Sequence, residues 1–124
     1  MTTDQATFVG ELKKQVGDFC EERDWRQFHS PKDLAIGITT ESAELLEIFR
    51  FQSDQQVADM LDRQDTRQEI GEELADVFFF LLRLSELYGF DLSSELKQKL
   101  EKNALRYSVA TSRGKNYKQK RGKS

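Results

Sequence analysis

Four acidic residues occur in the sequence as two pairs with the same three-residue spacing. Glu41 and Glu44 form the first pair, and Glu73 and Asp76 form the second. Residues three apart lie on one face of an α-helix, about one turn from each other. Apolar residues surround both pairs, which indicates that the carboxylates lie beside a hydrophobic core.

Such carboxylates repel one another unless something compensates their charge. At a separation of about 5 Å and an effective dielectric constant of about 20, two of them repel by about 3 kcal/mol. Four facing carboxylates must therefore stay apart, take up protons or share a cation. Oxygen ligands without Cys or His suit Mg²⁺, and they also suit Mn²⁺. The alternative is a salt-bridged helix surface, and the spacing alone leaves both interpretations open.

The spacing of apolar residues predicts four helices that would position these acids. We expect them over residues 7–24, 32–52 and 65–88, with a fourth helix beginning at about residue 91. Ser30 and Pro31 are start signals for the second helix, and Gly89 is a stop signal for the third. Residues 53–64 are polar and are predicted to form a loop with a short helical turn. No segment predicts a strand, so we expect an all-α fold with a four-helix bundle-like subunit.

Two of the expected helices carry apolar residues that must be covered. Residues 77–82 are apolar on every side of their helix, and such a helix needs contacts all round. A second subunit could supply them, which predicts a homo-oligomer, and the alternative is a central position within one subunit. In the fourth helix, Leu92, Leu96 and Leu100 form the expected buried stripe.

The composition narrows the class of protein. A chain of 124 residues suits one domain, expected over residues 1–110, and no apolar run is long enough for a membrane span. Cys20 is the only cysteine, so we expect a small core residue and a reducing, cytoplasmic location. Seven basic and no acidic residues lie from Arg106 onward, and residues 111–124 are predicted to form a flexible basic tail. The acidic remainder makes nucleic acid an unfavourable partner.

The segment before the second helix holds the only tryptophan and the only histidine of the chain. Trp25 either covers the helix ends or forms a stacking wall for a flat ligand such as a nucleobase. Taken alone, His29 fits a hydrogen-bonded structural residue better than a catalyst.

These motifs together resemble the MazG-like all-α nucleoside triphosphate pyrophosphohydrolases, and in particular their dCTP pyrophosphatase branch. Four segments carry the resemblance in the same order: RDWRQFHSPKDL at 23–34, ESAELLEIF at 41–49, EELADV at 72–77 and KNALRY at 102–107. The similar region covers about residues 8 to 118.

The resemblance implies Mg²⁺-dependent hydrolysis of a dNTP to dNMP and pyrophosphate, in a dimer or tetramer that serves nucleotide-pool housecleaning. The implied metal ligands are Glu41, Glu44, Glu73 and Asp76. Glu47 or Glu72 would orient or deprotonate the attacking water. The implied substrate-binding residues are Trp25, His29, Lys32, Phe51, Phe80, Lys102, Asn103, Arg106, Lys115 and Tyr117.

The sequence also departs from the dCTP-specific pattern at five positions. Val16 stands where His is usual, Phe51 where Trp is usual, and Phe80 where Tyr is usual. Asp33 replaces Asn, and Ser108 replaces Pro. The acids are retained, so we expect catalysis, but a strict preference for dCTP is not implied.

Two other classes of protein use acidic helices. A carboxylate-bridged di-iron bundle needs Glu-x-x-His on two helices, and no His lies on the helices expected here. A non-catalytic helical interaction protein with a basic tail would show no metal dependence and would tolerate Glu44→Gln.

Overall fold

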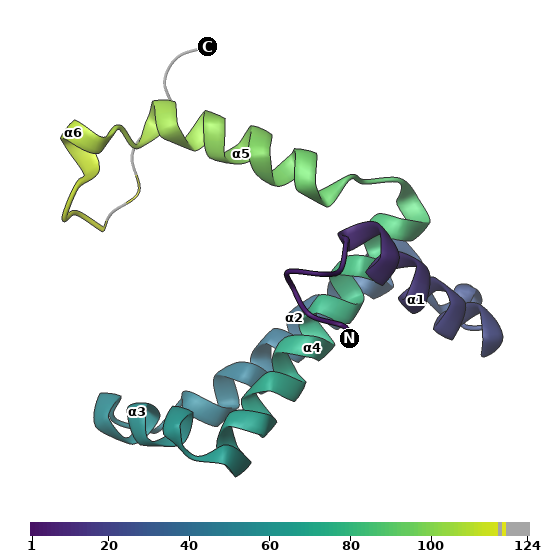
Figure 1. Ribbon diagram of the computed structural model, residues 1–124, viewed down its shortest axis with the longest axis horizontal. Helices are drawn as coiled ribbons and strands as arrows, with labels where there is room; N and C mark the ends of the chain where they lie inside the picture. The colour runs from purple at the N-terminus through teal and green to yellow at the C-terminus, as the bar shows by residue number, and fades with distance from the viewer. Residues whose placement is uncertain (117, 119–124) are drawn as a thin grey trace. The chain divides into compact units, whose positions relative to one another are not determined.

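The computed structural model describes residues 1–116 and 118, and every regular element in this part of the chain is helical (Figure 1). The all-α prediction is therefore confirmed. The chain forms two compact units, Met1–Gly89 and Phe90–Ser124. The first unit contains α1 (Val9–Glu22), the 3₁₀ helix η1 (Arg26–Phe28), α2 (Pro31–Phe49), α3 (Asp54–Asp62) and α4 (Gln64–Tyr88). The second unit contains α5 (Leu92–Arg106) and α6 (Val109–Ser112).

The domain boundary expected at residue 110 stays a prediction. Helix α6 spans that position, and residues 117 and 119–124 of the expected tail lie outside the described part of the chain. None of the helices in the described part combines the length and the apolar character that crossing a membrane requires.

The boundaries of α2 and α4 follow local signals in the sequence. Ser30 caps α2, since its Oγ accepts a hydrogen bond from the Asp33 N–H at 3.1 Å, and Pro31 occupies the first helical position. Helix α4 ends at Gly89, whose φ of 74° lies in the left-handed region that glycine adopts without strain. Both predicted boundaries are confirmed.

The expectation that residues 53–64 form a loop with a short turn is wrong, because α3 is a helix of nine residues. Its first turn is closed by a capping box. The Gln56 N–H donates to Ser53 Oγ at 3.2 Å, and the Ser53 N–H donates to Gln56 Oε1 at 2.8 Å. Apolar residues are too sparse in this segment to give a clear periodicity, and the Ser-x-x-Gln pattern is the signal that marks the helix.

Replacing Ser53 with alanine is expected to lower the free energy of unfolding by about 1 kcal/mol, because one end of the capping box is lost. Denaturant unfolding would measure it. Gln55→Ala, in the exposed first turn of the same helix, is the matched control and should change stability less. Equal effects of the two substitutions would contradict a stabilising role for the cap.

The core of the first unit lies where α4 packs against α1 and α2. Helices α2 and α4 lie side by side and run antiparallel (Figure 1). The buried apolar side chains are Cys20, Leu34, Ile70 and Leu82. The prediction that Cys20 is a small core residue is confirmed, since it is fully buried.

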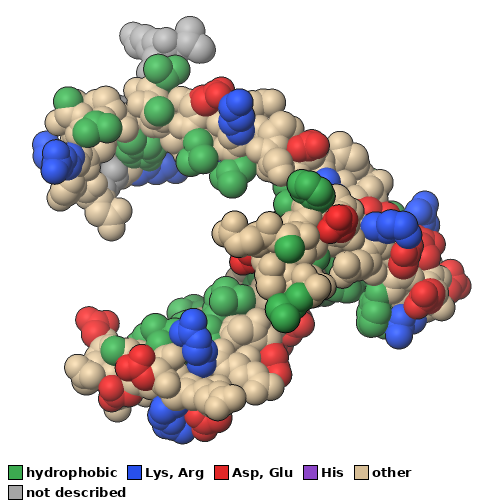
Figure 2. All heavy atoms as spheres, viewed as in Figure 1, with side chains coloured by type: hydrophobic (Ala, Val, Ile, Leu, Met, Phe, Trp, Pro, Cys, Tyr) green, Lys and Arg blue, Asp and Glu red, His purple; other side chains and the backbone are tan. Residues whose placement is uncertain are grey.

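The apolar second half of α4 is only partly covered within one chain. Leu82 is buried, but Phe78 and Leu81 remain 41% and 38% exposed. Figure 2 shows hydrophobic side chains at the surface along the first unit. The buried stripe predicted for the fourth helix is wrong for the single chain, because Leu96 and Leu100 of α5 are more than half exposed. Among the described residues, the second unit offers α5 no helix longer than the four-residue α6 to pack against.

Candidate metal centre

Four carboxylates from two helices converge in the first unit. Glu41 and Glu44 come from α2, and Glu73 and Asp76 come from α4. One carboxylate oxygen of each lies within 4.8 Å of the corresponding oxygens of the other three. The three-residue spacing aligns each pair along its own helix, and the antiparallel packing of α2 against α4 brings the two pairs together.

The cluster is electrostatically strained without a compensating charge. Glu41 and Glu73 are half-buried, and Oε2 of each is buried with no hydrogen-bond partner. Burial raises the pKa of Glu41 to about 7, and a hydrogen bond with Glu44 and the negative charges of the other three acids add to the effect. Burial also raises the pKa of Glu73, again with the charge of Glu44 contributing. A solvated, salt-bridged surface does not explain two buried oxygens without partners.

These residues fit a divalent cation that prefers hard oxygen ligands. The donor set contains only carboxylates, and the two buried oxygens without partners are available as ligands. A cation would supply the positive charge that the four acids lack, which is one of the three ways to relieve their repulsion.

The raised pKa of Glu41 predicts how the stability of the metal-free protein depends on pH. Because the folded protein binds the Glu41 proton more tightly than the unfolded chain does, this contribution to stability is present below the ordinary pKa of 4.5. It is lost as the pH rises through about 7. The melting temperature of wild type relative to Glu41→Gln should therefore fall over this range in the presence of a chelator. A difference that does not change with pH would contradict the raised pKa.

Comparison with known proteins identifies the family. Residues 36–120 match the model of the MazG-like family. The chain belongs to the MazG-like family. The match includes both pairs of clustered acids, α2 from residue 36 onward and the whole of α4.

Individual relatives agree with this assignment. The MazG-like chain is 34% identical to dCTP pyrophosphatase 1 of Rattus norvegicus over 104 residues, which are 84% of this chain and 61% of that protein. It is 30% identical to dCTP pyrophosphatase 1 of Homo sapiens over 103 residues, which cover 83% of this chain and 61% of that protein. The chain thus spans about three fifths of the length of these curated relatives.

A solved structure has the same fold. A pyrophosphatase from Archaeoglobus fulgidus DSM 4304 superposes with a TM-score of 0.76 at 34% sequence identity. The alignment covers 87% of this chain and 99% of that one. The MazG-like chain therefore shares its all-α fold with a protein of known structure.

The two acids expected to act on water lie outside the four-carboxylate cluster. Glu47, one turn beyond Glu44, is exposed, and its Oε1 pairs with the Arg50 guanidinium at 3.1 Å. Glu72 is exposed, and its Oε1 accepts a hydrogen bond from Gln68 Nε2 at 3.4 Å. Their catalytic roles remain predictions.

The expected substrate-binding residues of the first unit differ in their surroundings. The Trp25 ring packs edge-on near His29, with centroids 6.3 Å apart. Lys32 is exposed in the first turn of α2. Phe51 is 81% exposed with the Arg50 guanidinium over its ring, whereas Phe80 is half-buried against α2.

The remaining expected substrate-binding residues belong to the second unit. Three of them lie on one side of α5, because Arg106 follows Lys102 by four positions and Asn103 by three. Lys115 lines a pocket together with Tyr107, Ser112, Asn116 and Lys118. Tyr117 lies outside the described residues.

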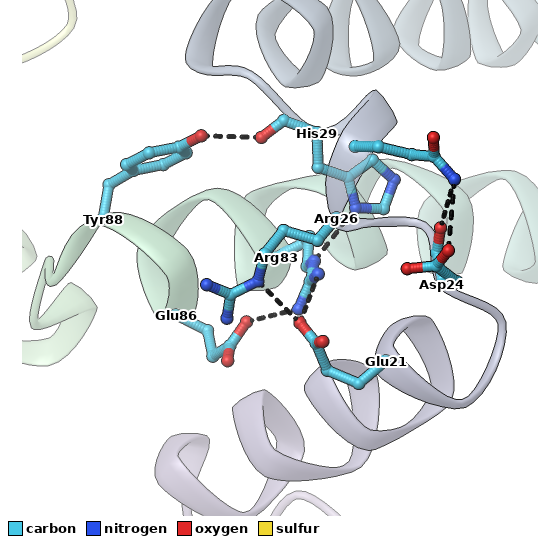
Figure 3. Close-up of polar contacts among 8 residues, drawn as sticks. Glu21, Asp24, Arg26, His29, Arg83, Glu86 and Tyr88 are labelled. Carbon is cyan, nitrogen blue, oxygen red and sulfur yellow. Dashed lines mark hydrogen bonds and ion pairs between the residues drawn. The ribbon is translucent and has the colours of Figure 1, made fainter.

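The sequence reading missed a buried polar network around Arg83 (Figure 3). The Arg83 side chain is fully buried and has three partners. Its Nε donates to His29 Nδ1 at 3.0 Å, and its two terminal nitrogens pair with Glu86 at 2.8 Å and Glu21 at 3.1 Å. Arg83 is the one polar residue in the segment VFFFLLRL at 77–84, and this isolated charge was the available signal.

The network fixes the segment that precedes α2. The Tyr88 hydroxyl donates to the His29 carbonyl oxygen at 2.7 Å, so both ends of this histidine are held by α4. Burial lowers the pKa of His29, and the nearby positive charge of Arg83 lowers it further. The imidazole ring is therefore favoured in its neutral form, which can accept a hydrogen bond. Hydrogen bonds from Arg83 and Arg26 lower the pKa of Glu21. The structural interpretation of His29 therefore accounts for its observed contacts, and a role in substrate binding stays a prediction.

Proposed function

We propose that this chain is a Mg²⁺-dependent pyrophosphohydrolase that converts a dNTP, either dCTP or a related dNTP, to dNMP and pyrophosphate. The observation that carries the proposal is the convergence of four carboxylates on α2 and α4, two of them with buried oxygens that have no hydrogen-bond partner. The names of the relatives, dCTP pyrophosphatase and pyrophosphatase, support the reaction class and the base. Mn²⁺ suits the same oxygen ligands.

Glu41, Glu44, Glu73 and Asp76 would hold the cation, which supplies positive charge against the triphosphate and a Lewis acid when bound. In the reaction, the oxygen of a water molecule bonds to the α-phosphorus, and the bond from that phosphorus to the oxygen bridging to the β-phosphorus breaks. Pyrophosphate leaves with the bond electrons. A carboxylate takes the proton of the water, and Glu47 and Glu72 are the candidates.

The substrate would be recognised by charge and by stacking. Lys102 and Arg106 supply positive charge for phosphates, and Asn103 on the same side of α5 supplies an amide for the sugar or a phosphate. Lys115 and Tyr117 would close over the phosphates. Trp25 would stack on the base, with His29, Lys32, Phe51 and Phe80 as further contacts.

We also propose that the active form is a homo-oligomer, either a dimer or a tetramer. The partly exposed apolar residues of α4 and α5 support this, because a second subunit would remove them from water. The buried lone Cys20 suits a reducing cytoplasm. The acidic body of the chain disfavours nucleic acid as a partner.

Pyrophosphate release from each of the four dNTPs, measured separately with and without Mg²⁺, tests the function. The nucleotide product is identified as monophosphate or diphosphate. We expect Mg²⁺-dependent formation of monophosphate and pyrophosphate, which a chelator abolishes and added Mg²⁺ or Mn²⁺ restores. Formation of diphosphate would contradict the assigned bond cleavage. The absence of any product with folded protein and Mg²⁺ would leave two interpretations, a modified nucleotide as substrate or a non-catalytic helical interaction protein. The interaction protein would tolerate Glu44→Gln, because its function would not depend on a bound metal.

A further inference from the structure

Gly37 of α2 faces the aromatic ring of Phe80 on α4. A Cβ built on Gly37 would lie 2.5 Å from Cε1, 2.6 Å from Cδ1 and 2.8 Å from Cζ of Phe80. Carbon atoms in contact are about 3.5–4.0 Å apart. The ring thus occupies the space that any side chain at position 37 would need.

The Phe80 ring is also in contact with a second aromatic ring of α4. It packs edge-to-face on Phe79, with centroids 5.4 Å apart, and Phe79 packs in the same way on Phe19 of α1, with centroids 6.1 Å apart. A row of three rings therefore links α1 to the contact with α2. A methyl group at position 37 would press against a supported ring and not against the free end of a flexible side chain.

This contact lies one helical turn from the carboxylate cluster. On α2, Gly37 precedes Glu41 by four residues, and on α4, Phe80 follows Asp76 by four residues. In the antiparallel pair, the Gly37–Phe80 contact is thus the next layer after the layer of Glu41 and Asp76. The distance between the helix axes in one layer constrains the distance in the next, because a helix is stiff over a single turn of about 5.4 Å.

We propose that Gly37 is a positioning residue for the metal centre: by admitting the Phe80 ring against the α2 backbone, it sets the separation of α2 and α4 at the carboxylates. The inference rests on the proposed cation site. Mg²⁺ requires near-ideal octahedral ligand geometry, whereas Ca²⁺ accepts longer and more variable oxygen distances. A small increase in helix separation therefore weakens Mg²⁺ binding more than Ca²⁺ binding, so the Mg²⁺/Ca²⁺ preference reports on the spacing.

The test is calorimetric titration of the full chain with Mg²⁺ alone and with Ca²⁺ alone. Gly37→Ala is expected to weaken Mg²⁺ binding by about tenfold or more, the scale on which supporting residues affect metal sites, and to weaken Ca²⁺ binding less. Gly71→Ala is the matched control, because it adds the same methyl group to a helical glycine of α4 that has nothing within 4 Å. Its affinity for both ions should equal that of wild type.

A second variant separates positioning from loss of folding. In Gly37→Ala/Phe80→Leu, the smaller side chain at position 80 leaves room for the new methyl group, so the Mg²⁺/Ca²⁺ preference is expected to return toward the wild-type value. Folding of each variant is checked by circular dichroism and melting temperature. Two results would overturn the positioning role while leaving the proposed function intact. One is that Gly37→Ala weakens the binding of Mg²⁺ and of Ca²⁺ equally. The other is that a folded Gly37→Ala protein binds Mg²⁺ with unchanged affinity. Failure of the wild-type chain to bind Mg²⁺ would overturn both.

Discussion

Replacing Glu41 with glutamine is expected to reduce the rate of dNTP hydrolysis by more than about 100-fold, because the proposed metal centre loses one of its carboxylate ligands and the charge that goes with it. The pKa of Glu41 is raised to about 7 by burial and by the neighbouring acids, so its charged form is disfavoured in the metal-free cluster. The same substitution should raise the melting temperature of the metal-free protein above pH 7, since a neutral amide removes repulsion from a half-buried site. Activity and stability should therefore change in opposite directions.

This opposition distinguishes a metal ligand from a structural acid. Asp76→Asn, which removes a carboxylate of the cluster from α4, should also abolish turnover. Glu69→Gln is the matched control, because it changes an acid of α4 that lies outside the four-carboxylate cluster, and it should retain most of the activity. Rates are measured by pyrophosphate release and melting temperatures by circular dichroism with a chelator present. Near-normal turnover in Glu41→Gln or Asp76→Asn would refute the assigned ligand set.

Replacing Arg83 with methionine is expected to lower the free energy of unfolding by about 1–3 kcal/mol, the cost of leaving buried polar groups without their hydrogen-bond donor. The Arg83 side chain is fully buried, and its loss would leave His29 Nδ1 and the partly buried carboxylate of Glu86 without their donors. The segment between α1 and α2 would also lose the bond from Arg83 of α4 and would keep the one from the Tyr88 hydroxyl. Denaturant unfolding of the metal-free protein gives the measurement.

Arg26 provides a control for the Arg83 substitution, since it also pairs with Glu21, at 3.0 Å, but its side chain is 66% exposed. Arg26→Met should cost less than about 1 kcal/mol, as exposed ion pairs do. Arg83→Lys keeps the charge but not the planar arrangement of donors, so it should restore only part of the lost stability. If Arg83→Met and Arg26→Met destabilised the protein equally, the buried network would not be the element that holds this segment.

The sequence by itself determined the features that depend on short separations along the chain. The three-residue spacing placed the acids of each pair on one face of one helix, and Ser30, Pro31 and Gly89 marked helix boundaries through local capping and backbone conformation. The order of four motifs identified the MazG-like family, which the family match confirms. Helix α3 could have been recognised in the same way, because its capping box is local, but its few apolar residues obscured the periodicity.

Only the tertiary structure decided the features that join residues far apart in the chain. The antiparallel packing of α2 against α4 brought the two acid pairs within reach of one cation, and partial burial between these helices raised the pKa of Glu41 and Glu73. The partners of Arg83 include residues 54 and 62 positions away, so no local pattern names them. The close fit of the Phe80 ring on Gly37 likewise depends on how two helices meet. Burial and distance between side chains are set by packing, and a one-dimensional pattern of residue types contains neither.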